Sequence, residues 1–445
     1  MRIKKRFFCL IISILTVNAF AQKLWTLEEC IAHAVSHNIS VKQMEIAQRA
    51  AKTDLTSAKM AFLPDLNASA GQNWNFGRTQ MQSGLYENQA QSNTTFSVGS
   101  SAPIFAGFRL VHAAAKAKLS LQAAALNLQK AKNDVELQVT SLFLQALFQK
   151  EILKIAQERF ATTKQQTEKT KILVENGKIA YSQLLDIQSQ AANDTMSVVQ
   201  TASDLKLALL DLAQSLELQN IENFNIDDEI NLIDAATGNE KKSLFLSAEN
   251  IYNLAVNNKP EIKSQELSVK IAEKSLKIVQ SAYFPTINLS AGIGTNYFYL
   301  YKNQGLNTAF AEQANANLGE YISLTLSVPL FNRLSVVNQS KQAKYNIENQ
   351  RFELDKAKKQ LFKEIQTAYH NAILANEKQT AAAQAVTAAK ESFLYARERY
   401  ANGKLSVFEF SQAQTRLSQA QTEEIQAKYE HVFRVKILEF YRKLY

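Results

Sequence analysis

The spacing of apolar residues along the chain switches twice from a helical period to strict alternation. Between residues 66 and 102, and again between 287 and 328, apolar side chains alternate with small polar ones. In the last of these runs Ile322, Leu324 and Leu326 are each separated by one polar residue. A two-residue period with one apolar face is typical of β-strands. The pattern therefore predicts two strand hairpins set between helical segments.

A long run without glycine or proline follows each hairpin. The first covers residues 108–176 and ends at Gly177, and the second covers residues 330–402 and ends at Gly403. A single helix of that length would extend about 100 Å at ~1.5 Å per residue. We predict long helices over about 108–176 and 334–402. Each would end at its glycine, which suits a left-handed position at a helix C-terminus.

The second half of the chain repeats the first. Residues 61–64 (AFLP) return as 282–285 (AYFP), and residues 176–178 (NGK) return as 402–404 (NGK). Each half is therefore expected to fold as the same unit: two shorter helices, a hairpin, a long helix and a further helix.

The N-terminus has the pattern of a secretory signal. A basic start is followed by an apolar stretch and by the small-x-small sequence Ala19-Phe20-Ala21, so residues 1–21 are predicted to direct export. We expect the rest of the chain to divide into a first repeat at 22–219, a linker or equatorial segment at 220–246, and a second repeat at 247–445.

Composition argues against several functional classes. The formal charge of +9 is distributed along helical runs that also carry acidic residues, which favours solvated helix faces over a nucleic-acid patch. The sequence contains no glycine-rich phosphate loop, nucleophile elbow or H-E-x-x-H motif, so we predict neither an enzyme nor a cofactor. Cys30, His33 and His37 share a helical face, but a fourth metal ligand is not apparent, and packing is the favoured interpretation.

Four amphipathic strands that cross a membrane cannot close a barrel alone, and lipid tolerates no open sheet edge. Association in a ring is therefore expected, and two, three or four copies would each give an even-numbered barrel. The competing interpretation is a soluble sheet edge or a hairpin packed on helices.

The signal segment, the duplicated unit, the strand ends Pro103-Ile104-Phe105 and Pro329-Leu330-Phe331 and the two glycine turns together resemble the TolC-type outer-membrane efflux family. The resemblance covers the whole chain after the signal. It implies a mainly α fold with β-hairpins. In this fold three protomers build a 12-stranded outer-membrane β-barrel continuous with a long periplasmic α-helical barrel, in a Gram-negative bacterium.

The resemblance also implies a function and partners. The family provides the passive exit duct of tripartite efflux or type I secretion systems, without enzymatic activity or cofactors. Its partners would be two further copies of the chain, a periplasmic adaptor (membrane fusion protein), an inner-membrane transporter of RND or ABC type, and outer-membrane lipid, with no nucleic acid. The alternatives are a periplasmic coiled-coil scaffold or tether without a pore, and a secreted helical enzyme. The substrate stays open.

The family's functional positions can be transferred residue by residue. The turns that meet the adaptor correspond to Asn176, Gly177, Lys178, Ile179, Asn402, Gly403, Lys404 and Leu405. The acidic ring of the entrance falls on Glu409 and Gln412, so only one acid is kept. A polar latch would join Gln183 to Tyr400, with Leu405 at a place that can hold an arginine and Asp186 as an acid that could compensate.

Overall fold

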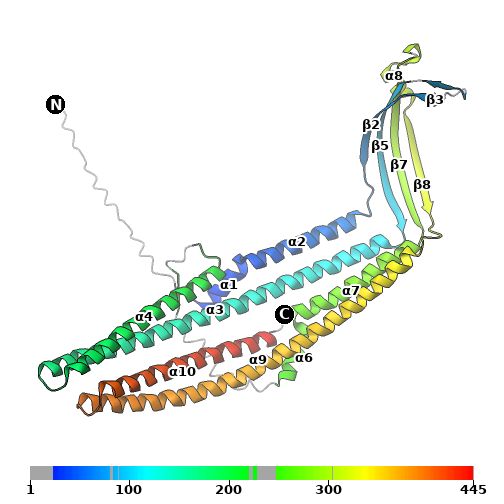
Figure 1. Cartoon of the computed structure of the whole chain (residues 1–445). Helices are drawn as coiled ribbons and strands as arrows, with labels where there is room; N and C mark the ends of the chain where they lie inside the picture. Colours follow the sequence, from blue (N-terminus) through cyan, green and yellow to red (C-terminus); the bar gives the residue numbers. More distant parts are fainter. Residues whose placement is uncertain are drawn as a thin grey trace, which may run out of the picture. The chain divides into compact units, whose positions relative to one another are not determined.

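The computed structural model describes residues 24–80, 84–88, 90–219, 224–227, 247–302 and 304–443 (Figure 1). The predicted signal at 1–21 and most of the predicted linker at 220–246 lie outside these residues. The chain forms two compact units, and each draws on both sequence repeats. Of the described residues, the first unit comprises 24–39, 133–219, 224–227, 247 and 367–440, and the second comprises 40–80, 84–88, 90–132, 248–302, 304–366 and 441–443.

The helices follow the duplicated order that the sequence predicts. The first repeat contains α1 (Leu27–His37), α2 (Ile39–Met60), α3 (Arg109–Glu175) and α4 (Tyr181–Ser215), and the second contains α6 (Ala248–Asn258), α7 (Pro260–Gln280), α9 (Ser335–Ala401) and α10 (Val407–Arg442). Helices α3 and α9 each have 67 residues. Among the described residues, none of the helices is long and apolar enough to cross a membrane.

Local signals explain where the shorter helices start. Thr26 caps α1 in a capping box with Glu29, in which each side chain bonds the other residue's backbone N–H. Pro260 occupies the first turn of α7, where its missing N–H costs nothing. In the first unit, β1 (Leu24–Trp25) and β6 (Asn225–Ile226) form a short parallel pair beside α1.

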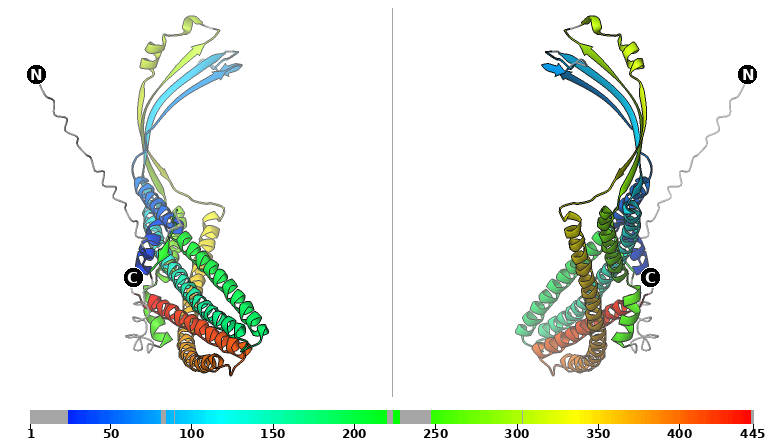
Figure 2. Two further views of the ribbon diagram at one scale, coloured as in Figure 1. Left: turned by 90° about the vertical axis from the view of Figure 1, so that its left-hand side faces the viewer. Right: turned by 90° about the vertical axis from the view of Figure 1, so that its right-hand side faces the viewer.

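The second unit carries one antiparallel sheet of four strands. The strands are β2 (Asn67–Asn75), β5 (Gln91–Ala106), β7 (Thr286–Leu300) and β8 (Gly319–Ser327), hydrogen-bonded in that order. Figure 2 shows the sheet curving along its length. The central strands β5 and β7 are longer than the outer two, and β5 pairs with β7 over almost its whole length, with an irregularity between Pro103 and Phe105.

The strand register places the apolar residues on one face of the sheet. Paired residues share a face, so the pairs Ala291–Ile322, Leu289–Leu324 and Ile287–Leu326 define an apolar face. The opposite face is polar and small: Ser69 and Ser97 are paired there, and their hydroxyls lie 2.7 Å apart. The alternation in the sequence thus predicts the two faces correctly. On the polar face the Tyr321 ring covers Gly292, where a Cβ would lie only 2.7 Å from the ring.

The segments that connect the strands of each hairpin contain further short elements. The first loop forms a small hairpin from β3 (Arg78–Gln80) and β4 (Tyr86–Asn88). The second forms a 3-10 turn, η3 (Gln304–Leu306), and a short helix, α8 (Phe310–Ala316), which packs on β7 (Figure 1). Elements of three to seven residues are too short to give a periodic signal.

Candidate functional site

The two helix turns at Gly177 and Gly403, with the helix ends that flank them, form the candidate site, which we call the tip. Both glycines have positive φ, +67° and +68°. In each turn the hydrogen bonds have Schellman geometry. At the first turn, the Gly177 N–H donates to the Val174 carbonyl and the Lys178 N–H to the Leu173 carbonyl, each at 2.9 Å. The second turn repeats this pattern at Gly403 and Lys404.

The tip glycines are required by backbone conformation and not by crowding, because nothing lies within 4 Å of a Cβ built at either position. Gly177→Ala or Gly403→Ala is therefore expected to cost about 1 kcal/mol of backbone strain. Amide hydrogen exchange in the last turn of α3 or α9 should accelerate about five-fold. Gly305→Ala is the control, because Gly305 has no positive φ and equally open surroundings. Unchanged exchange in both tip variants would contradict this account.

The predicted adaptor-contact residues divide by exposure. The side chains of Asn176, Lys178, Asn402 and Lys404 are exposed, whereas Ile179 and Leu405 are half-buried. Leu405 packs against the apolar cluster beneath the second turn, so it fixes the turn as well as contributing to its surface. The asparagines are also engaged locally, since each side chain donates to a carbonyl four residues earlier, at 2.7 Å for Asn176 and 2.9 Å for Asn402.

Glu409 holds the start of α10. Its carboxylate accepts hydrogen bonds from the Ser406 N–H at 3.0 Å and from the Ser406 hydroxyl at 2.8 Å, while its own N–H donates to that hydroxyl at 3.3 Å. The start of α4 has no equivalent, because Ala180 at its N-cap has no capping side chain. The S-x-x-E pattern of a capping box is visible in the sequence, and the sequence analysis missed it.

These bonds, together with the charge of Arg399, hold the pKa of Glu409 below its usual value. A carboxyl with a lowered folded-state pKa stabilises the fold above its unfolded-state pKa, and this contribution disappears as pH falls through the lowered value. We expect Ser406→Ala to return the pKa of Glu409 toward its usual value and to increase fraying of the first turn of α10. Hydrogen exchange, divided by its intrinsic rate at each pH, measures this. Ser182→Ala at the start of α4 is the matched control and should change little.

Beneath the turns lies an apolar cluster from three helices. Its buried members are Leu184 and Ile187 of α4, Phe393 and Tyr400 of α9, and Val407 and Phe410 of α10. The Tyr400 ring stacks on Phe410 with centroids 4.9 Å apart. Its hydroxyl lies 2.8 Å from the Thr170 hydroxyl of α3. Tyr400 thus joins the helix pair α9 and α10 of the second repeat to the helix pair α3 and α4 of the first.

The predicted gating residues differ in their exposure and in their hydrogen-bond partners. Within the chain the partner of the Tyr400 hydroxyl is Thr170, and Gln183 lies half-buried on α4. Asp186 and Gln412 are exposed, and so is Glu409. The three exposed side chains are accessible to other molecules, whereas the Tyr400 hydroxyl already bonds Thr170 and so joins the two helix pairs.

The same helices also contain a buried polar network, which the sequence analysis did not predict. Asp194 of α4 is 1% exposed. Its carboxylate forms an ion pair with Arg159, whose Nε lies 2.9 Å away, although the Nε–H of Arg159 does not point at the carboxylate oxygen. It also accepts from the Thr163 hydroxyl at 2.6 Å and from Gln190 Nε2 at 2.8 Å. Gln414 of α10 donates to the Arg159 carbonyl and the Thr163 hydroxyl, each at 3.1 Å. The network therefore connects α3, α4 and α10.

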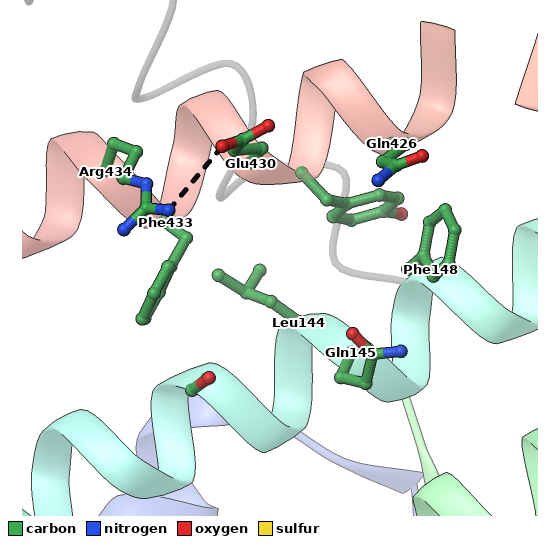
Figure 3. A pocket seen from close by; sticks show the side chains of 9 residues that line it. Leu144, Gln145, Phe148, Gln426, Glu430, Phe433 and Arg434 are labelled. Carbon is green, nitrogen blue, oxygen red and sulfur yellow. Dashed lines mark ion pairs between the residues drawn. The ribbon is translucent and has the colours of Figure 1, made fainter. Parts of the chain in front are cut away.

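A groove of about 390 Å³ lies between α3 and α10 in the same unit (Figure 3). In it, Leu144 of α3 points toward Phe433 of α10, and Phe148 of α3 lies opposite Gln426 of α10. Its one carboxylate, Glu430, is paired with Arg434 at 3.5 Å and with Lys378 at 3.6 Å. The groove therefore presents mainly aromatic and amide groups and no unpaired acid.

Comparison with known families identifies the chain. A family model described as outer membrane efflux protein matches residues 30–217 and 251–435, one range in each repeat. The chain belongs to this family. The resemblance to TolC-type proteins inferred from the repeats is thereby confirmed, and membership places this efflux protein in the outer membrane with a periplasmic extension.

Curated relatives of this efflux protein include the outer membrane protein TolC of Escherichia coli K12, 21% identical over 243 residues, which are 54% of this chain and 45% of the relative. TolC of Salmonella enteritidis is 25% identical over 165 residues, 36% of this chain and 32% of the relative. The matched regions thus span less than half the length of these relatives.

Solved structures show the fold over almost the whole chain. A membrane protein from Pseudomonas aeruginosa gives a TM-score of 0.77 at 13% identity, covering 94% of this chain and 90% of the other. The outer membrane protein VceC of Vibrio cholerae gives 0.74 at 14% identity, covering 94% of both chains. The mainly helical, TolC-like fold predicted from the sequence is confirmed.

Proposed function

We propose that this chain, with further copies of itself, forms a passive exit duct through the outer membrane. The observation that carries the proposal is the four-stranded sheet, which has one apolar face, one polar face and two open edges, at β2 and β8. Lipid would cover the apolar face, and water would fill the space behind the polar face. Open edges in lipid require closure by other copies, and we propose a homotrimer by analogy with the family.

The connection between the sheet and the long helices favours a duct rather than a scaffold as the function. Strand β5 leads directly into α3, and β8 is followed closely by α9, so a pore lined by the sheet would continue between long helices. A coiled-coil tether without a pore would have no use for a sheet with a lipid-facing and a water-facing side. Conduction would be passive, because the sequence has no nucleotide-binding loop.

The tip is the proposed entrance and docking surface for a periplasmic adaptor, which would connect the duct to an inner-membrane transporter. Exposed Lys178 and Lys404 stand on the two matching turns, so an adaptor could contact both turns in the same way. Glu409, one oxygen of which caps α10, would contribute one carboxylate per copy to the entrance. Asp186, on α4, would add a second exposed acid to the entrance.

Membrane fractionation and native mass measurement test this function. The protein is expected in the outer membrane fraction as an oligomer of about three 49.9 kDa chains that conducts ions in planar bilayers. A soluble monomer would overturn the duct. A membrane-bound oligomer without conductance would support the scaffold instead. Growth of a deletion strain on a compound panel, with its secretome, would identify the substrate class.

A further inference from the structure

Three aromatic rings lie on the apolar side of the junction between the sheet and the helices. Phe105 of β5 pairs with Ile287, which lies on the apolar face of the sheet, and paired residues share a face. The Phe108 ring packs edge-on against Phe105 and Phe284, with centroids 5.3 and 6.3 Å away. Phe108 and Phe284 are also 54% and 47% exposed. We call these three phenylalanines the aromatic cluster, and they continue the apolar face past the end of β5.

The start of α3 lies directly against the chain that links α7 to β7. At Gly107, where φ is +58°, a Cβ would lie 2.4 Å from the carbonyl oxygen of Ser281, in the 3-10 turn η2 (Ser281–Tyr283). Glycine is therefore needed for this close approach. Both helix ends lie at the base of the sheet, within the second unit (Figure 1). Side chains from the first turns of α3 and the last turns of α7 can thus act together.

The first turns of α3 are strongly basic. Residues 109–133 contain five lysines and arginines and no acid, whereas residues 335–359, at the start of α9, contain six basic residues and three acids. His112 is one turn further along α3 than Phe108, whose carbonyl accepts the His112 N–H at 3.0 Å. Residues four apart share a helix face, and helical side chains lean toward the N-terminus of their helix. His112 therefore lies on the side of the aromatic cluster and leans toward the sheet.

Two lysines of α7 bring further positive charge to His112. Partial burial, together with the charges of Lys274 and Lys277, holds the pKa of His112 below its usual value, so both lysines lie near this ring. Among the described residues neither lysine forms an ion pair, and their neighbour Glu273 is paired with Arg351 of α9 at 3.5 Å. We call His112, Lys274 and Lys277 the basic cluster. Unbalanced positive charge of this kind favours an anionic ligand.

We propose that the basic cluster binds the phosphate of an acidic phospholipid in the periplasmic leaflet of the outer membrane, with the acyl chains of this lipid beside the aromatic cluster. The inference rests on the proposed function, because it needs the sheet to cross the membrane. His112 is four residues from Phe108, about 6 Å along α3 at ~1.5 Å per residue. The headgroup layer on each side of the hydrocarbon core is about 5–7 Å thick. With the aromatic cluster at the edge of the hydrocarbon, His112 therefore lies among the headgroups.

The combination of rings and lysines favours a lipid over a soluble anion. Aromatic residues form girdles at the membrane interfaces, and lysine stems lie along apolar surface while their ammonium groups reach polar surroundings. A soluble anion would bind the basic cluster without any need for the half-exposed rings of Phe108 and Phe284 beside it. An acidic phospholipid uses both clusters at once, because its hydrocarbon covers the rings and its phosphate meets the lysines.

Lipid titration of the full-length oligomer, read by native mass spectrometry, tests the site. Lys274→Gln with Lys277→Gln should weaken binding of phosphatidylglycerol roughly 25-fold, at about five-fold for each lysine, and leave the weaker binding of zwitterionic phosphatidylcholine within about two-fold. Lys164→Gln with Lys169→Gln is the matched control, because it removes two exposed lysines of α3 far from the sheet. Binding of both lipids to this control should be unchanged. The same spectra give the oligomer mass, so a variant that fails to assemble is recognised separately.

The outcomes separate this inference from the proposed function. Equal weakening in the two double variants would show that net charge alone attracts the lipid and would overturn the site. An intact, conducting oligomer that binds both lipids equally well would also overturn the site and leave the duct intact, whereas a soluble monomer would overturn the proposed function as well. Displacement of phosphatidylglycerol by an equal concentration of inorganic phosphate would assign the basic cluster to a soluble anion and overturn the lipid.

Discussion

Replacing Asp194 with alanine is expected to destabilise the tip half of the molecule more than any other single polar change there. Only the Asp194 side of this ion pair is fully buried, since the Arg159 side chain is 22% exposed, and the main cost is that of buried hydrogen-bonding groups left unsatisfied, about 1–3 kcal/mol for each group. Arg159 would lose its carboxylate, and the Thr163 hydroxyl and Gln190 amide would lose an acceptor. Local opening of α3 and α4 around these residues should accelerate by roughly two to three orders of magnitude, within the ceiling set by global unfolding.

Hydrogen exchange with peptide resolution is the suitable measurement, because it reports the local opening of α3 and α4 separately from the rest of the molecule. Asp211→Ala is the matched control: it removes an exposed carboxylate from the same helix and should leave exchange within two-fold. The double variant Arg159→Ala with Asp194→Ala should recover part of the loss, because it leaves no buried charge. Equal exchange rates in Asp194→Ala and Asp211→Ala would show that the network does not hold helices α3, α4 and α10 together.

This network also shows why part of the site was hidden in the sequence. On α3, Thr163 and Thr170 are fully buried, yet threonines at helical spacing among lysines and glutamines look like a solvated face. Their partners, Gln414 and Tyr400, lie more than two hundred positions away in the other repeat. Hydrophobic periodicity cannot indicate a polar core, because its pairing depends on contacts between distant elements.

Features governed by local chemistry could be predicted. The glycine turns follow from the need for positive φ at Gly177 and Gly403, and helix α3 ends one residue from its predicted limits at both ends. The capping box of Ser406 and Glu409 was equally local, and it was missed because Glu409 was considered only as an entrance acid. The register of the sheet was beyond reach, because it depends on which strands meet.

Introducing arginine at Leu324 is expected to prevent stable membrane assembly, whereas arginine at the neighbouring Thr325 is expected to be tolerated. Leu324 lies on the apolar face, where lipid would surround the new charge at a cost of about 2–4 kcal/mol near the bilayer midplane. Thr325 lies on the polar face, where water would solvate the same side chain. The two variants differ by one position in β8, so strand propensity and local sequence are closely matched.

The level of heat-resistant oligomer in outer membranes and guanidinium unfolding in phospholipid vesicles both measure the difference. A lower oligomer level and unfolding midpoint for Leu324→Arg alone would support lipid on the apolar face. Equal losses for the two variants would indicate that both faces are packed against protein, and a larger loss for Thr325→Arg would reverse the assignment of the faces. The comparison therefore tests, with one residue pair, whether the sheet forms the wall of a water-filled barrel, which is the premise of the proposed duct.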